Sequence, residues 1–250
     1  MSTDNTITFF DIPTKEPKTC WSFNTWRDYK TEWVSSLRET LRRLTADTVQ
    51  IEYPDLKPTF EPHLPPNEMA GGIYTAPTIR LPDGTYIMDS KHISALLEEK
   101  YPEPSIHLDP KLYARLIEQL KGGMGSLTTV YVTQVPARLL SQRSVEFFKK
   151  TREEMLGMAL EEYAKSIPRD EAFAKAVPYL RKITEMLQEK EGPFFKGEQV
   201  SYTDFVWAGV LLFFKVQGDE TFEDFMESTG DRTVHEKFLE ALSPWTKRHD

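Results

Sequence analysis

The sequence predicts a small α/β domain followed by a larger all-α domain. Residues 76–101 carry a strand, turn, strand and helix pattern. Beyond residue 110, strand-like runs become rare and apolar residues recur at helical spacing. Between these regions, residues 102–110 contain three prolines, which are typical of a linker. The chain of 250 residues is long enough for two such domains.

The first elements form a strand, helix and strand. Residues 7–12 are a β-type run closed by Pro13. A helix is predicted to begin between residues 22 and 24, where Ser and Asn suit the N-cap position, and to extend to about residue 44. Residues 48–53 alternate like a second strand, which Pro54 is expected to end. This order predicts a βαβ unit.

A β-hairpin is predicted next. The short apolar runs 76–81 and 85–88 flank Leu81-Pro82-Asp83-Gly84-Thr85, a sequence suited to a tight turn with a partly left-handed backbone. Pro77 has no N–H group to donate, so we place it at the start of its strand. Residues 54–72, between the second strand and the hairpin, are rich in proline and are expected to be irregular apart from one short helix.

A helix is predicted to follow the hairpin, with Asp89 or Ser90 as its cap. Its apolar stripe consists of Ile93, Leu96, Leu97 and Tyr101. A βαβ unit followed by a hairpin and a helix is a thioredoxin-like order. The predicted fold class is therefore an α/β N-terminal thioredoxin-like domain followed by an all-α helical domain.

The second domain is predicted to begin with Asp109 as a cap and Pro110 in the first helical turn. Residues 128–135 are β-rich and are expected to break a helix. Ser201 and Asp204 have the spacing of a capping box in front of the apolar run 205–214, which predicts a buried helix. Two further helical faces are predicted, one formed by Met155, Leu156, Ala159, Leu160 and Tyr163, the other by Phe173, Ala176, Val177, Leu180, Ile183 and Leu187.

Composition excludes several function classes. The net charge of −8 and the absence of a long basic block disfavour nucleic acid as a partner. The apolar run 205–214 is about half the length of a membrane span, and the N-terminus lacks the pattern of a signal peptide. A single cysteine, Cys20, suits a reducing compartment, so we expect a cytoplasmic protein. The five histidines lack metal-ligand spacing, so no metal site is predicted.

Several motifs together resemble the glutathione S-transferase superfamily. Ala76-Pro77 opening a hairpin that ends in Asp89-Ser90 resembles the glutathione-binding half of these enzymes. Residues 21–26, Trp-Ser-Phe-Asn-Thr-Trp, are similar to a signature of the fungal etherase-like, serine-type branch, although Phe23 replaces a proline of that signature. Residues 144–157 resemble a helix of the same branch, and the capping box at Ser201 and Asp204 is common to the superfamily.

The resemblance implies a domain organisation and a partner. Residues 1–101 would form the thioredoxin-like, glutathione-binding domain, residues 102–109 the linker, and residues 110–250 the helical domain that supplies the second-substrate pocket. Glutathione would be the co-substrate or catalyst, an apolar small molecule the second substrate, and the protein a homodimer.

The resemblance also implies roles for the residues of the glutathione site. Pro77 would be in the cis form, the backbone of Ala76 would pair with the cysteinyl part of the tripeptide, and Asp89 and Ser90 would hold its γ-glutamyl end. His63 lies in the loop where the glycine carboxylate often binds, and we treat it as a weaker candidate. In isolation, Asp89 and Ser90 are equally well explained as helix caps, and capping is compatible with ligand binding.

For the thiol itself the candidate is Ser22. A hydroxyl at a helix N-terminus stabilises a thiolate by hydrogen bonding and by the positive end of the helix dipole. Ser22 as a helix cap alone is the competing interpretation, and Asn24 and Thr25 are alternatives for the same contact. Cys20 is a rival nucleophile of the kind that some transferase branches use, but it is not part of a Cys-x-x-Cys pair.

The resemblance implies an enzyme that activates the glutathione thiol for addition to an apolar electrophilic small molecule. One alternative is a glutathione-dependent cis-trans isomerase of fungal natural-product metabolism, in which the thiolate adds to a conjugated alkene and leaves again after rotation. The extra length between residues 26 and 52 and the Phe23 departure are consistent with such a specialised substrate. A second alternative is a non-catalytic ligand-binding module.

Overall fold

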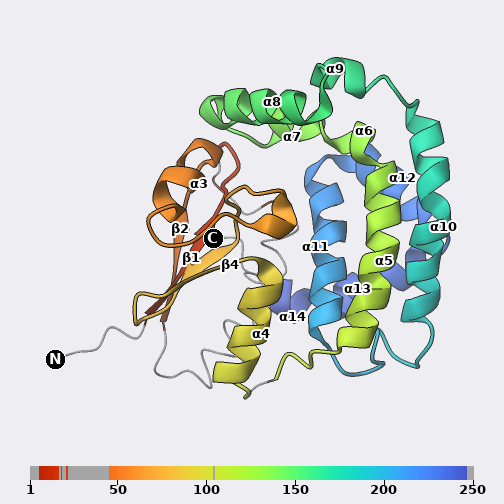
Figure 1. The fold of residues 1–250 in the computed structure, drawn as a ribbon. Helices are drawn as coiled ribbons and strands as arrows, with labels where there is room; N and C mark the ends of the chain where they lie inside the picture. The colour runs from red at the N-terminus through yellow and green to blue at the C-terminus, as the bar shows by residue number, and fades with distance from the viewer. Residues whose placement is uncertain (1–5, 17, 19–20, 22–44, 104, 247–250) are drawn as a thin grey trace.

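The computed structural model describes residues 6–16, 18, 21, 45–103 and 105–246. The helix predicted between residues 22 and 44 lies outside the described residues. A small sheet with two flanking helices is followed along the chain by helices only (Figure 1). This is the fold class that the sequence predicts. Where the first domain ends, between residues 101 and 110, stays a prediction.

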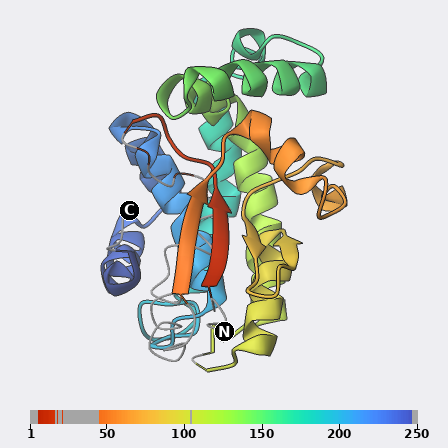
Figure 2. The ribbon, with the colours of Figure 1, turned by 90° about the vertical axis from the view of Figure 1, so that its left-hand side faces the viewer.

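The sheet has four strands in the order β2-β1-β3-β4: β1 Thr6–Asp11, β2 Thr45–Gln50, β3 Thr78–Arg80 and β4 Tyr86–Met88. β1 is parallel to β2 and antiparallel to β3, and β3 is antiparallel to β4. In Figure 2 the parallel pair stands in front of the helical layer. The parallel pair requires a crossover connection between residues 11 and 45, as a βαβ unit does.

The prediction for residues 48–54 was partly wrong. β2 lies earlier in the chain than expected, and helix α3, Tyr53–Phe60, begins where the strand was predicted to end. Pro54 occupies the first turn of α3 instead of closing a strand. Because N–H groups in a first helical turn have no partner within the helix, proline is accepted there at no cost in hydrogen bonds. A single 3₁₀ turn, η1 Glu68–Ala70, follows in the proline-rich stretch.

The hairpin turn has the predicted chemistry. Leu81 N donates to the Thr85 carbonyl at 2.8 Å, and Gly84 N donates to the Leu81 carbonyl at 2.9 Å. Thr85 N donates to Asp83 Oδ1 at 2.9 Å, and Gly84 has φ = 87°, which a residue with a side chain rarely adopts. The turn therefore fixes the register of β4 against β3, and with it the position of Asp89 directly after β4.

One face of the sheet is covered by α3. Phe60 packs edge-on against Phe10 with ring centroids 5.2 Å apart, and against Tyr86 at 6.4 Å. After β4, helix α4, Ser90–Lys100, packs on β3 and β4 and buries Ile93 and Leu97. Segments that precede and follow the hairpin in the chain therefore both pack on the sheet.

Helices α5 to α14 form the second part of the chain. Their bounds are α5 Pro110–Ser126, α6 Thr128–Tyr131, α7 Gln134–Arg138, α8 Gln142–Leu156, α9 Leu160–Tyr163, α10 Arg169–Leu187, α11 Tyr202–Val216, α12 Asp219–Ser228, α13 Arg232–Ala241 and α14 Ser243–Thr246. α11 lies beside α5 and α12 and contributes most of its length to the core (Figure 1). Among the described residues, no helix is long and apolar enough to cross a membrane.

Helix breaks follow local sequence. The β-rich stretch 128–135 does interrupt the helix, since α5, α6 and α7 are separate. The single helical face predicted between Met155 and Tyr163 was wrong, because Gly157 ends α8 with φ = 70° and α9 begins only at Leu160. A glycine in the left-handed region is a common helix end. The face predicted from Phe173 to Leu187 is confirmed on α10.

The predicted capping box at the start of α11 is present. Asp204 Oδ2 accepts from Ser201 N at 2.8 Å and from Ser201 Oγ at 2.6 Å, while Asp204 Oδ1 accepts from Phe195 N at 2.9 Å. Asp204 is fully buried, and burial raises the pKa of its carboxyl to about 6 in spite of these donors. Two of these bonds satisfy backbone N–H groups and the third satisfies the Ser201 hydroxyl, at a buried helix end that water cannot reach.

His235 is the second buried titratable group of the helical part. Its Nδ1 accepts from Trp207 Nε1 at 3.1 Å, and its Nε2 lies 2.8 Å from Thr184 Oγ1. Because Thr184 Oγ1 donates to the Thr229 carbonyl, Nε2 carries the proton and donates to Thr184. Burial lowers the pKa of His235 to about 4, so the ring is neutral at neutral pH.

His235 makes stability depend on pH. Its pKa is about 4 when folded and 6.5 in its unperturbed state, so the unfolded chain takes up the proton first as pH falls. The stability that neutral His235 contributes is complete above pH 6.5 and is lost toward pH 4. Relative to pH 7.5, the loss at pH 5 should be about 2 kcal/mol.

Asp204 acts in the opposite direction over the same range, because its pKa is raised and its protonation favours the folded state. The effect of His235 is therefore isolated by comparison with His235→Gln. Urea unfolding of both proteins at pH 7.5 and pH 5 should show the stability advantage of the wild type shrinking by about 2 kcal/mol. An advantage that is equal at the two pH values would contradict the assignment.

Candidate functional site

The candidate site is the edge of the sheet where the hairpin begins and ends. The Ala76–Pro77 peptide bond is cis, and both residues are buried. Asp89, directly after β4, donates its backbone N–H to the Pro77 carbonyl at 3.4 Å. Asp89 has φ = 80°, an uncommon conformation for a residue with a side chain. Such backbone outliers occur most often at functional sites.

The Asp89 carboxylate has partners on two sides. Its Oδ1 accepts from Lys91 N at 3.0 Å, so Asp89 is the cap of α4, as one reading of the sequence predicted. Its Oδ2 accepts from Asn67 Nδ2 at 3.3 Å. The side chain is half-buried, so the carboxylate stays reachable from solvent at the N-terminus of a helix. That end of a helix favours anionic groups.

Asn67 is a site residue that the sequence did not reveal. Its Nδ2 also lies 3.3 Å from Thr75 Oγ1, just before the cis peptide bond. A small loop fixes Asn67: its N–H donates to the Ile73 carbonyl and its carbonyl accepts from Gly72 N, both at 2.9 Å. Asn67 lies in the proline-rich stretch without periodicity, so no pattern marks it. Only the bond to Asp89 identifies it.

Ser90 links the site to the helical part. It is the first residue of α4 and is buried, and its carbonyl accepts from the Tyr202 hydroxyl at 3.5 Å. Tyr202 is the first residue of α11, and its N–H donates to the Ile106 carbonyl at 2.8 Å. The N-termini of α4 and α11 therefore meet at the site.

His63 lies apart from Asp89. Its exposed ring stacks on Tyr86, with ring centroids 4.2 Å apart and planes 5° apart. Tyr86 is the first residue of β4, whereas Asp89 follows the last one. The structure therefore places His63 at the other end of β4, and its contact with a ligand stays a prediction.

Ser22, Asn24, Thr25 and Cys20, the candidates for the thiol, lie outside the described residues. Trp21, directly before Ser22, is buried, and its Nε1 is without a hydrogen-bond partner among the described residues. The Trp21 ring lies 6.3 Å from that of Phe213 of α11, and Tyr131 packs edge-on against Phe213 at 5.4 Å. We call Trp21, Tyr131 and Phe213 the aromatic cluster.

Three pairs of adjacent phenylalanines, at 147–148, 194–195 and 213–214, are mostly core. Phe148, Phe194, Phe195, Phe213 and Phe214 are buried, whereas Phe147 is 37% exposed. Of these, Phe213 packs against Trp21. The aromatic cluster therefore combines the side chain preceding Ser22 with residues of α6 and α11.

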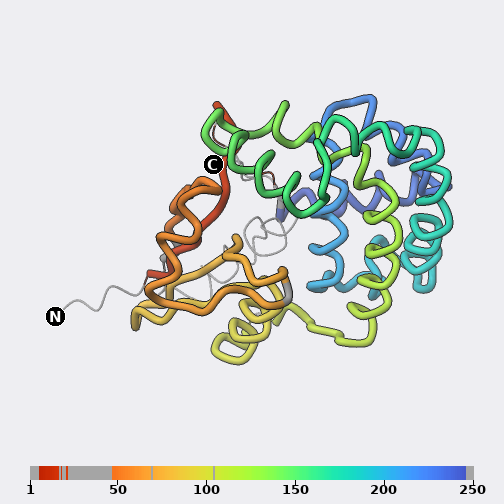
Figure 3. The backbone as a smooth tube through the Cα atoms, turned by 45° about the horizontal axis from the view of Figure 1, so that its top comes forward, coloured from red at the N-terminus to blue at the C-terminus, as the bar shows by residue number. Residues whose placement is uncertain are grey.

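Helix α8 packs across α3 and is held there by hydrogen bonds and an ion pair (Figures 1 and 3). Glu52 Oε2 accepts from Ser141 Oγ at 2.6 Å and from Ser144 Oγ at 3.1 Å. Arg143 pairs with Asp55 through two hydrogen bonds between guanidinium and carboxylate. A carboxylate with two hydroxyl donors and a two-point ion pair define the position of α8 relative to the sheet.

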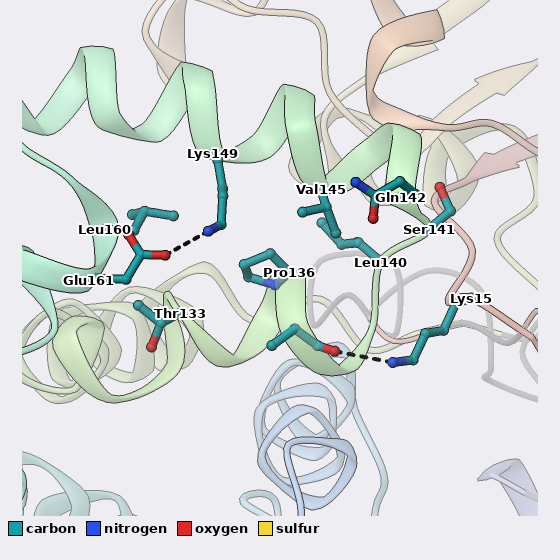
Figure 4. A pocket seen from close by; sticks show the side chains of 11 residues that line it. Lys15, Thr133, Pro136, Leu140, Ser141, Gln142, Val145, Lys149, Leu160 and Glu161 are labelled. Atoms are coloured by element: carbon teal, nitrogen blue, oxygen red, sulfur yellow. Dashed lines mark hydrogen bonds and ion pairs between the residues drawn. The ribbon is translucent and has the colours of Figure 1, made fainter.

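A cavity of about 470 Å³ lies between α7, α8 and α9 (Figure 4). Its apolar lining includes Pro136, Leu140, Val145 and Leu160. At one end Lys149 pairs with Glu161 at 2.6 Å, and at the other Lys15 Nζ donates to the Ala137 carbonyl at 3.1 Å. Both lysines are thus already partnered, and the cavity suits an apolar occupant. The lining residues do not include those of the hairpin site.

Within the ranges that the structure describes, no group of three or more His, Cys, Asp or Glu side chains is arranged to hold a metal ion. The chemistry available at the hairpin is a carboxylate, an amide and a helix N-terminus, which together suit a zwitterionic ligand with an amino group and a carboxylate.

Comparisons with known proteins agree with this geometry. A family model described as Glutathione S-transferase, C-terminal domain, matches residues 118–245, about half of the chain. The chain is 28% identical over 174 residues to the Glutathione S-transferase-like protein ustS of Aspergillus flavus. That match spans 62% of this chain and 62% of the relative, less than two thirds of its length.

Two solved structures are similar over nearly the whole chain. A glutathione S-transferase of Ceriporiopsis subvermispora, solved in complex with glutathione, has a TM-score of 0.77 and 27% identity, with 96% of each chain covered. The glutathione transferase GSTFuA3 of Phanerochaete chrysosporium has a TM-score of 0.76 and 25% identity, again with 96% of each chain covered.

Proposed function

We propose that this chain, which belongs to the glutathione S-transferase family, is an enzyme that binds glutathione at the hairpin and activates its thiol for addition to an apolar electrophile. The observation that supports it most is the placement of Asp89. Its half-buried carboxylate lies at the N-terminus of α4, hydrogen-bonded to Asn67 and joined by its backbone to Pro77. The similar Ceriporiopsis enzyme was solved with glutathione bound.

The two ends of the γ-glutamyl group match the two features of this site. Its ammonium group is a cation that can donate a hydrogen bond to the Asp89 carboxylate. Its carboxylate is an anion that the N-terminus of α4 stabilises. The backbone of Ala76, directly before Pro77, would pair with the cysteinyl part of the tripeptide. Ser90 would complete the γ-glutamyl end.

Ser22 would supply the chemistry. A free thiol of pKa about 8.5 is only a few per cent thiolate at pH 7, so a hydroxyl that donates to the sulfur increases the reactive fraction. The thiolate then forms a carbon–sulfur bond to the electrophile. In a substitution the leaving group departs with the electron pair, and in an addition to an alkene the adjacent carbon takes up a proton.

We also propose that the protein acts in the cytoplasm, where glutathione is the main small thiol and the single Cys20 would stay reduced. Mass spectrometry of the products formed with glutathione separates the alternatives. A conjugate supports the transferase, free glutathione with altered alkene geometry supports the isomerase, and no turnover supports a binding module.

Replacing Asp89 with Ala should weaken glutathione binding by about 1.5–3 kcal/mol, because a charge-assisted hydrogen bond is lost. Titration calorimetry measures the change. Asp89→Asn is the matched control, since an amide oxygen can still cap α4 but lacks the charge, and its affinity should fall almost as far. Unchanged affinity in Asp89→Ala would remove glutathione from this site. A loss in Asp89→Ala alone would assign Asp89 to capping only.

Replacing Ser22 with Ala should raise the pKa of the bound thiol by about one to two units, while tripeptide binding persists. Activity at pH 7 should then fall roughly tenfold to a hundredfold and recover in part at higher pH. Thiolate absorbance against pH, recorded for both proteins, measures the shift. Titration curves that overlay would make Ser22 a helix cap, and Asn24, Thr25 and Cys20 would be tested in its place.

We propose a homodimer, since two-fold pairing of the first domain of one subunit with the second of its partner is usual for this family. Sedimentation at micromolar concentration should show a species of twice the 29.0 kDa chain mass. A single species of the chain mass would refute the dimer.

A further inference from the structure

Arg152 is a cation placed among aromatic side chains. It shares one stripe of α8 with Ser144 and Phe148, at spacings of four residues, and this stripe faces α3. The guanidinium carbon lies 4.8 Å from the centroid of the Phe148 ring. Phe148 in turn packs edge-on against Tyr53 at 5.7 Å. A guanidinium over a ring face is held in place and keeps its N–H edge free for an anion.

The charge of Arg152 is not compensated by a carboxylate in the described part of the chain. Four other described arginines have acidic partners, among them Arg143 with Asp55 and Arg169 with Asp224, whereas Arg138 donates to the Gln217 carbonyl. Arg152 has only a marginal contact from Nη1 to Thr151 Oγ1 at 3.5 Å. Its side chain is half-buried. A half-buried cation without an anionic partner among the described residues is available to an anionic ligand.

Two phenols whose protonation Arg152 influences stay neutral. Burial raises the pKa of Tyr53 to about 12, although Arg152 acts to lower it and Asp11 adds to the increase. Burial likewise raises the pKa of Tyr131, whereas a hydrogen bond with Thr128 and the charge of Arg152 act to lower it and Tyr163 adds to the increase. Both phenols therefore keep their protons at neutral pH.

We propose that Arg152 recognises a carboxylate on the second substrate, and that the substrates are aromatic or conjugated monocarboxylic acids carrying an electrophilic carbon. The proposal rests on the proposed function and deepens it. A planar guanidinium matches a carboxylate in a two-point hydrogen bond. One cation balances one negative charge, whereas a phosphate would carry more. The aromatic surroundings of the guanidinium, formed by Phe148 and Tyr53, suit an unsaturated substrate.

The position of Arg152 is consistent with such a substrate. Tyr131, whose phenol Arg152 influences, packs on Phe213, and Phe213 contacts Trp21 beside Ser22. The ring contacts of the aromatic cluster lead from Tyr131 to Trp21, the residue directly before the proposed thiol activator Ser22. The cavity of Figure 4 offers space but no comparable charge, since Lys149 and Lys15 are already partnered there.

Binding of unreactive acids and their uncharged amides tests the proposal. The probes are cinnamate with cinnamamide and biphenyl-4-carboxylate with its carboxamide, titrated by calorimetry in saturating glutathione. The wild type should bind at least one acid roughly 10- to 100-fold more tightly than its amide, the equivalent of one hydrogen-bonded ionic contact. Arg152→Gln should remove this preference and leave amide affinity within about twofold. Arg152→Lys should keep part of it.

Lys150→Gln is the matched control, because Lys150 is an exposed cation on the same helix and its loss should leave the preference intact. Thermal unfolding of each variant establishes that α8 is folded. Equal affinity for acids and amides in the wild type, or binding of none of the probes, would overturn the proposal. Glutathione affinity in the same titrations reports on the proposed function separately, since Arg152→Gln should not alter it.

Discussion

The hydrogen bonds of the buried Asp204 carboxylate hold the N-terminus of α11, and the rest of the structure depends on that helix. α11 is apolar nearly all round, so burial drives it into the core. Burial leaves its first N–H groups without water, and the carboxylate and hydroxyl of the capping box replace that water. With its N-terminus held by these hydrogen bonds, α11 is a fixed element against which other elements pack.

Two contacts connect α11 with the candidate site. At its N-terminus, the Tyr202 hydroxyl lies 3.5 Å from the carbonyl of Ser90, the residue directly after Asp89 at the start of α4. Further along, Phe213 packs against Trp21 and Tyr131. The proposed glutathione site and the residue before the proposed thiol activator thus both contact α11. These shared contacts would hold a thiolate and an electrophile at a defined separation.

The position of α8 relative to the sheet is a second constraint on the site. Glu52 and the ion pair between Arg143 and Asp55 fasten it to the sheet side, and this brings Phe148 and Arg152 toward Tyr53. Exposed ion pairs contribute little stability singly, so their value here is positional. Substrate choice would then be set by residues of α6, α8 and α11, while the hairpin would hold glutathione. Such a division lets the second substrate vary without disturbing the first.

The sequence alone determined the features that depend on near neighbours. Hydrophobic periodicity predicted the fold class, turn chemistry predicted the hairpin, and cap residues predicted the starts of α4, α5 and α11, because each rests on bonds within a few residues. It failed where one residue type serves two structures, as at Pro54, which suits a strand end and a first helical turn alike. Only the tertiary structure could show Asn67 on Asp89, His63 on Tyr86 and Arg152 over Phe148 beside Tyr53. Apart from Arg152 and Phe148, these contacts join residues far apart in the chain, and the chain brings them together only by packing its elements.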